Sequence, residues 1–165
     1  MKDVRPTSGR VLSAMFSILG GKVEGSSFLD LFAGTGRVGL EALRRGASSC
    51  VFVEGVKARA EELRRSSGRS ECLVLGLEVR RAVSWLMKRA MTFSVIFADP
   101  PYSSGWCEAL PALPNLNALF AHDAVMVIEH SSREPLTTLT NNPNNLEITS
   151  TREYGETCLT FLKML

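Results

Sequence analysis

Apolar residues recur along the chain with two alternating spacings. Val11, Met15 and Leu19 lie four residues apart, as they would on one face of a helix, and predict an amphipathic helix there. Further along, short continuous apolar runs typical of buried strands alternate with longer segments of helical period. The predicted strands are residues 28–32, 50–53, 72–75, 94–98, 124–129, 147–150 and 158–162. The predicted helices after the first are residues 37–45, 57–67, 80–91 and 116–120.

This strand–helix alternation predicts a single α/β domain over residues 1–165, with a helical segment at about residues 5–20 before the first strand. We expect a mainly parallel seven-stranded sheet with helices on both faces. The last two strands have no clear helix between them, so they are expected to form an antiparallel hairpin at one edge. In open sheets of this kind, ligands bind at the carboxyl ends of the strands, near the point where strand order reverses.

Composition restricts the class of protein without naming its chemistry. No apolar run reaches the roughly 18 residues that a membrane-spanning helix needs, so no membrane partner is expected. The four cysteines are widely separated and form no C-x-x-C pair, which argues against a zinc site or a redox motif. We therefore expect a reduced, cytoplasmic protein without a bound metal.

The net charge of +2 hides an uneven distribution. Residues 1–89 carry 16 Lys and Arg against 9 Asp and Glu, whereas residues 90–165 carry 3 against 8. The basic half could be a set of solvated helix faces, or it could hold the phosphates of a nucleic acid. On the second interpretation, Arg10 and Arg37 are candidate RNA contacts, because they lie in segments that lead toward the ligand-binding end of the sheet.

The segment LDLFAGTGRVG, residues 29–39, runs from a predicted strand through a glycine-rich turn into a predicted helix. Glycine lets the backbone turn sharply and approach a ligand closely, and a helix start offers free N–H groups. Asp30 is an acid in an apolar strand, where it needs a hydrogen-bond or charge partner. We predict that Asp30, Phe32, Gly34 and Gly36 bind a cofactor. The G-x-G-x-x-G spacing fits a nicotinamide dinucleotide as well as S-adenosylmethionine.

Glu54 ends the second predicted strand, in the sequence VFVE. An acid at this place can accept hydrogen bonds from both hydroxyls of a ribose. Glu54 is therefore a further candidate cofactor ligand, again for either cofactor.

The sequence ADPPY, residues 98–102, lies at the end of the fourth predicted strand and distinguishes between the two candidate cofactors. The carboxylate of Asp99 and the carbonyl of Pro100, held rigid by Pro101, can accept both hydrogens of an amino group. Tyr102 can stack on the base that carries this amino group. Such acceptors aim the nitrogen lone pair at a methyl donor, whereas hydride transfer needs no such arrangement. We predict that these four residues are catalytic and that S-adenosylmethionine is the cofactor.

Taken together, these motifs resemble the RsmD family, which has the Rossmann-like class I methyltransferase fold. The resemblance covers nearly the whole chain in the expected order: RPTSGRVLSAMFSIL, LDLFAGTGRVGLEALRRGA, VFVE, ADPPY, VIEH and REYGETCLTFL. It implies methyl transfer to the exocyclic N2 amine of a guanine in 16S rRNA, within a 30S subunit or an assembly intermediate, by a monomer. By position, it adds Arg5 and Thr7 to Arg10 as candidate contacts to RNA.

The sequence departs from the family pattern in two places. Family members usually carry a further basic segment before RPT, which would strengthen contact with RNA. The family also places an acid or amide followed by Ala after the third strand, against the adenine of the cofactor, where this chain has Arg81 and Ala82. Arginine cannot accept a hydrogen bond, so we expect Glu78 or backbone carbonyls to substitute and cofactor affinity to be lower.

Three other functions remain open from the sequence. A DNA amino-methyltransferase would share ADPPY but usually needs a target-recognition segment, for which 165 residues leave little room. A catalytically weak S-adenosylmethionine-binding protein could assist ribosome assembly by binding alone. A dinucleotide oxidoreductase would use the same glycine loop but has no use for ADPPY.

Overall fold

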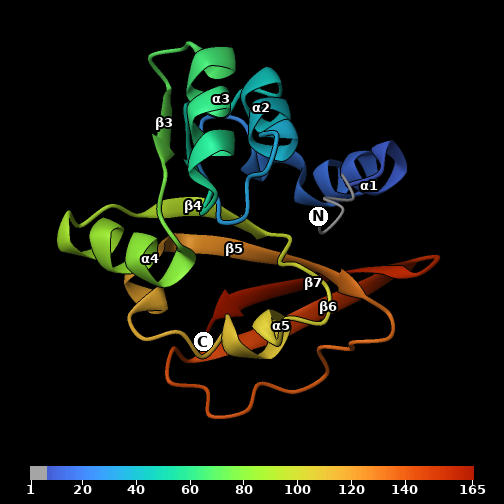
Figure 1. Ribbon diagram of the computed structural model, residues 1–165. Helices are drawn as coiled ribbons and strands as arrows, with labels where there is room; N and C mark the ends of the chain where they lie inside the picture. The colour runs from blue at the N-terminus through green and yellow to red at the C-terminus, as the bar shows by residue number, and fades with distance from the viewer. Residues whose placement is uncertain (1–6) are drawn as a thin grey trace.

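The computed structural model describes residues 7–165 and shows one mixed sheet with helices on both faces (Figure 1). The strand order is β3-β2-β1-β4-β5-β7-β6. The strands are β1 (Ser27–Asp30), β2 (Ser49–Val53), β3 (Cys72–Leu75), β4 (Phe93–Ala98), β5 (Phe120–Ser131), β6 (Leu146–Tyr154) and β7 (Thr157–Met164). The first five run parallel, and β7 pairs antiparallel with both β5 and β6. The predicted parallel sheet and edge hairpin are therefore confirmed.

The helices divide between the two faces of the sheet. In Figure 1, α1 (Gly9–Leu19), α2 (Arg37–Arg44) and α3 (Lys57–Ser67) cover one face, and α4 (Val79–Lys88) and α5 (Trp106–Ala109) cover the other. Two 3-10 turns complete the chain, η1 (Gly20–Lys22) and η2 (Leu116–Leu119). The α1 helix begins where Ser8 caps it, with the hydroxyl of Ser8 accepting a hydrogen bond from the N–H of Val11 at 3.3 Å.

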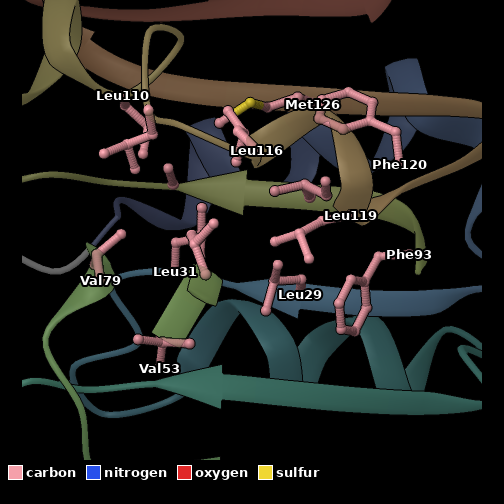
Figure 2. Close-up of a cluster of buried hydrophobic side chains, with 14 of the residues drawn as sticks. Leu29, Leu31, Val53, Val79, Phe93, Leu110, Leu116, Leu119, Phe120 and Met126 are labelled. Atoms are coloured by element: carbon pink, nitrogen blue, oxygen red, sulfur yellow. The ribbon is translucent and has the colours of Figure 1, made fainter. Parts of the chain in front are cut away.

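Each face of the sheet has its own core because the parallel strands are buried on both sides. Figure 2 shows the cluster on the α4 side, where Leu29 of β1 and Leu31, just after that strand, pack with Val79 of α4 and with Leu116 and Leu119 of η2. The opposite cluster joins apolar residues of α1, α2 and α3 to the other faces of the same strands. Burying both faces of β1 and β4 fixes the loops that leave their carboxyl ends.

Several local predictions differ from the structure. The helix predicted at residues 80–91 is Val79–Lys88, and the strand predicted at residues 124–129 is Phe120–Ser131. The chain has an additional short helix, α5, after ADPPY, where its four residues gave too short a periodic signal. The helix predicted at residues 116–120 is a single 3-10 turn, and its last residue already begins β5. The final two strands are longer than predicted, because polar residues on their solvent side also pair. Within residues 7–165, no helix is long and apolar enough to cross a membrane.

Candidate active site

Two cavities meet at the carboxyl ends of the parallel strands. Strand order reverses between β1 and β4, and the loops that follow these strands face each other there. The first cavity, of about 530 Å³, is called the glycine-loop cavity. It is lined by Leu31, Phe32, Gly34, Val53, Glu54, Gly55, Val56, Arg59, Glu78, Val79, Asp99, Pro100, Pro101, Tyr102 and Trp106.

The second cavity, of about 540 Å³, lies toward the β6–β7 hairpin and is called the hairpin cavity. It is lined by Ser8, Arg10, Val11, Tyr102, Ser103, Glu129, Ser131, Arg133, Glu134, Tyr154, Gly155, Glu156 and Thr157. Tyr102 lines both cavities, so the segment ADPPY forms the wall between them.

The glycine loop takes a left-handed turn before α2. Gly34 and Gly36 have φ angles of 55° and 79°, which side chains rarely allow. A Cβ on Gly36 would collide with the side chain of Leu63 on α3, so only glycine fits between the loop and that helix. Gly34 lines the glycine-loop cavity, whereas Gly36 lies behind the loop and is buried.

Glu54 fixes this loop from the end of β2. Its Oε2 accepts a hydrogen bond from the N–H of Gly34 at 2.9 Å, and its Oε1 accepts one from the N–H of Val56 at 2.9 Å. Arg59 of α3 forms an ion pair with Oε1 at 3.3 Å. A carboxylate can accept about four hydrogen bonds, so these three contacts leave capacity for one ligand hydroxyl. Glu54 is 6% exposed and faces the cavity.

Asp30 lies behind the loop, at the end of β1, and is not among the residues that line either cavity. It is only 1% exposed, and burial raises its pKa to about 7. The backbone N–H groups of Gly39 and Phe32 oppose this shift, while the charge of Glu54 adds to it. Among residues 7–165, neither carboxylate oxygen of Asp30 has a hydrogen bond of normal geometry. Asp30, which was predicted to bind the cofactor, is therefore buried beside the loop and does not line the cavity.

The segment ADPPY leaves β4 as a rigid corner. Asp99 lines the glycine-loop cavity, and burial raises the pKa of its carboxyl to about 8, with smaller contributions from the charges of Glu129 and Asp30. The hydroxyl of Ser104 donates a hydrogen bond to the carbonyl of Pro101 and closes the turn. Tyr102 is 43% exposed and lines both cavities.

The N-terminal segment reaches this site through Thr7. The hydroxyl of Thr7 donates a hydrogen bond to Oε2 of Glu129 at 2.8 Å, and Nη1 of Arg37 donates to the carbonyl of Thr7 at 2.5 Å. Thr7 is buried, so two of the predicted RNA contacts, Thr7 and Arg37, instead contact each other. Arg10 is exposed and lines the hairpin cavity, and Arg5 lies outside the described residues.

The structure does not bring Arg81 and Ala82 into the glycine-loop cavity. Because α4 begins at Val79, Ala82 turns into the core and Arg81 turns to solvent, and neither lines the cavity. Glu78 and Val79 lie there in their place. Glu78 caps α4, its side chain accepting a hydrogen bond from the N–H of Arg80 at 3.1 Å. Glu78, the acceptor expected to substitute for the family's acid or amide, thus lines the cavity, whereas Arg81 does not.

Trp106, Arg59 and Glu129 are among the lining residues that were not predicted. Trp106 closes the glycine-loop cavity, with its ring 5.5 Å from that of Phe32 and 4.3 Å from the guanidinium carbon of Arg80. Arg59 and Glu129 line one cavity each. An acid inside the apolar strand that contains Glu129 was the only sequence signal, and it resembles the one that singled out Asp30.

Comparisons with known proteins found a matching family model, relatives in sequence and solved structures of the same fold. The family model described as "Conserved hypothetical protein 95" matches residues 1–163. Ribosomal RNA small subunit methyltransferase D of Haemophilus influenzae is 32% identical over 144 residues, covering 85% of this chain and 75% of that protein. The Escherichia coli protein of the same name is 29% identical over 139 residues, covering 84% and 70%. A solved hypothetical protein of Thermus thermophilus superimposes with a TM-score of 0.77 at 27% identity, covering 99% and 90%.

Proposed function

Because the chain belongs to the RsmD family of methyltransferases, we propose that it transfers a methyl group from S-adenosylmethionine to the exocyclic N2 amine of a guanine in 16S rRNA. The relatives named above are methyltransferases of small-subunit ribosomal RNA, which supports rRNA as the substrate. The choice of the N2 amine rests on the resemblance in sequence and on the acceptors of ADPPY.

One observation carries the proposal: ADPPY separates two cavities of similar size, and Tyr102 borders both. A group transfer between two bound molecules needs a shared boundary at which the reacting atoms meet. Asp99 and Pro100 line this boundary on the glycine-loop side, where a methyl donor would lie. The hairpin cavity, which is lined by polar and charged side chains, would take the base.

The glycine-loop cavity fits S-adenosylmethionine by the chemistry of its lining. Its volume lies within the roughly 300–1,000 Å³ of small-molecule sites. Glu54 has capacity for a ribose hydroxyl, Glu78 can accept from an adenine amine, and Phe32, Val79 and Trp106 offer an apolar surface for the adenine ring. When bound, this cofactor supplies a methyl group on a positively charged sulfur.

The residues of ADPPY orient the accepting amine. Asp99 in its ionised form and the carbonyl of Pro100 each accept one N–H, which directs the nitrogen lone pair away from the ring and toward the donor side. The carboxylate of Asp99 would stabilise the positive charge that develops on the nitrogen as it takes the methyl group from the donor sulfur, and would accept the proton that the methylated nitrogen then releases. Tyr102 holds the base by stacking.

The experiment that tests this function is methylation of 30S subunits isolated from bacteria that lack the endogenous enzyme. The purified protein is incubated with these subunits and isotope-labelled S-adenosylmethionine, and the 16S rRNA is digested and mapped by mass spectrometry. We expect one labelled N2-methylguanosine. Naked 16S rRNA and duplex DNA serve as competing substrates. Label on DNA alone would favour the DNA enzyme, and binding without methyl transfer would favour an assembly protein.

A further inference from the structure

Glu129 is a buried acid that the reaction described so far does not use. It lies in β5, is 4% exposed, and lines the hairpin cavity together with Tyr102. In the register of β4 with β5, Ala98 lies opposite Ile128, so the next residues, Asp99 and Glu129, emerge side by side from neighbouring strands. The acid that orients the amine therefore has a second acid beside it, on the base side.

The position of Glu129 is held by hydrogen bonding. Its Oε2 accepts from the hydroxyl of Thr7, and the backbone of Thr7 is in turn held by Arg37. Among residues 7–165, its Oε1 accepts no hydrogen bond. One oxygen is thus fixed by the protein, and the other remains available to a ligand in the cavity that Glu129 lines.

Base chemistry indicates what this oxygen would meet. Guanine carries its exocyclic amine next to a ring N–H, at N1. Adenine and cytosine carry their amines next to a ring nitrogen that has only a lone pair. With the amine held at Asp99, a neighbouring carboxylate would accept from N1–H of guanine but would oppose the lone pair of the other two bases.

We infer that Glu129 selects guanine by accepting the N1–H beside the methylated amine. This assignment rests on the proposed function. It makes Glu129 a specificity-determining residue, distinct from Asp99, which acts on the amine itself. The other charged side chains around the hairpin cavity are less suited to accept a hydrogen bond from N1–H. Arg133 pairs with Glu156 at 2.7 Å, and Arg10 cannot accept a hydrogen bond. Glu134 lies after the end of β5, beyond the register that places Glu129 next to Asp99.

The test uses 2-aminopurine, which keeps the amine at C2 but has a lone pair in place of N1–H. Once mapping has identified the methylated guanosine, 16S rRNA carrying 2-aminopurine at that position is made by splinted ligation and assembled into 30S particles. The unmodified protein should methylate guanine about 10- to 100-fold more efficiently, in kcat/KM, than 2-aminopurine, the range expected for one hydrogen bond to a charged group.

Glu129→Gln provides the decisive comparison, because its amide can donate to a lone pair as well as accept from N–H. In this variant, the preference for guanine should fall to within about threefold of unity. Glu153→Gln, the same change on β6 outside both cavities, should keep the full preference. Equal use of the two bases by the unmodified protein, or an unchanged preference in Glu129→Gln, would overturn the inference while leaving the methyltransferase function intact. Absence of any methylated guanosine would overturn both.

Discussion

The carboxylate of Glu54 accepts a hydrogen bond from the N–H of Gly34 at 2.9 Å, which joins the loop after β1 to the end of β2. The same carboxylate is the one with room for a ribose hydroxyl. Its hydrogen bonds to the protein hold the loop in place without a ligand, so the side chain proposed to bind the cofactor also shapes the cavity.

Glu54→Gln should weaken binding of S-adenosylhomocysteine by about 10-fold or more, because the amide can no longer accept from Gly34, Val56 and a ribose hydroxyl together. Isothermal titration calorimetry measures this change. Glu61→Gln, on the solvent side of α3, is the matched control and should bind normally. NAD should bind neither variant nor the unmodified protein. Tight NAD binding would contradict the assignment of the cavity.

Substitutions at Glu78 and at Arg81 should have different effects on the affinity for S-adenosylhomocysteine in the same assay. Glu78→Ala should weaken S-adenosylhomocysteine binding by about 1 kcal/mol, the size of one hydrogen bond, because Glu78 lines the cavity. Arg81→Asp should leave the affinity unchanged, because Arg81 points to solvent. Since Glu78 also caps α4, thermal unfolding of Glu78→Ala is needed to show that the protein remains folded. Tighter binding by Arg81→Asp would place Arg81 near the adenine after all.

Asp99→Ala should reduce kcat by about 10² to 10³, since it removes a group that acts on charge developing in the transition state. The pH profile gives an independent check. The pKa of Asp99 is raised to about 8, so its ionised form is the minority species below that pH. The single-turnover rate should rise about tenfold per pH unit on the acid side and level off above pH 8. Asp30→Asn, which alters a neighbouring acid, should keep this acid limb, and Asp99→Asn should lose it.

Tyr102→Ala should weaken the binding of 30S particles by roughly 1 to 3 kcal/mol, the range for stacking of one base, with a smaller change in kcat. Tyr102→Phe should be mild because the ring remains. Filter binding and single-turnover methylation report affinity and rate separately. A large loss of affinity in Tyr102→Phe would show that the hydroxyl, rather than the ring, stabilises the bound base.

Asp30→Asn should change how stability depends on pH. The pKa of Asp30 is raised from 3.8 to about 7, so the folded state keeps a proton that the unfolded state loses. The free energy that protonated Asp30 contributes to folding is fully present below pH 3.8 and is lost as the pH rises to about 7. Asparagine does not titrate. The free energy of unfolding of Asp30→Asn, relative to that of the unmodified protein, should therefore increase by up to about 4 kcal/mol between pH 4 and pH 8. Urea unfolding across this range tests the slope, and parallel curves for the two proteins would contradict it.

The sequence predicted the fold well because each buried strand carried its own local signal. The α3 helix and β3 have the bounds expected from the hydrophobic pattern, and the hairpin followed from the missing helix before the last strand. Helices of a single turn, such as η2 and α5, were not predicted correctly, because four residues are too few to show a helical period.

The site was predicted less completely, for a different physical reason. The lining residues that were predicted follow the carboxyl ends of parallel strands, which lie along one edge of the sheet. These residues are Gly34, Glu54, Asp99 and Tyr102. Glu129 and Thr7 meet only because β5 and the segment before α1 converge in space, 122 residues apart in the chain. Arg81 was expected against the adenine because of the family pattern, whereas α4 begins at Val79 and turns Arg81 to solvent.

The two cavities draw on different stretches of the gene. All residues that line the glycine-loop cavity fall between positions 31 and 106, whereas the lining of the hairpin cavity comes from positions 8–11, 102–103 and 129–157. Tyr102 alone belongs to both sets. If the two cavities hold the nucleotide and the methyl donor as proposed, substitutions in the final third of the chain would change which nucleotide is accepted and leave the cofactor site unaltered.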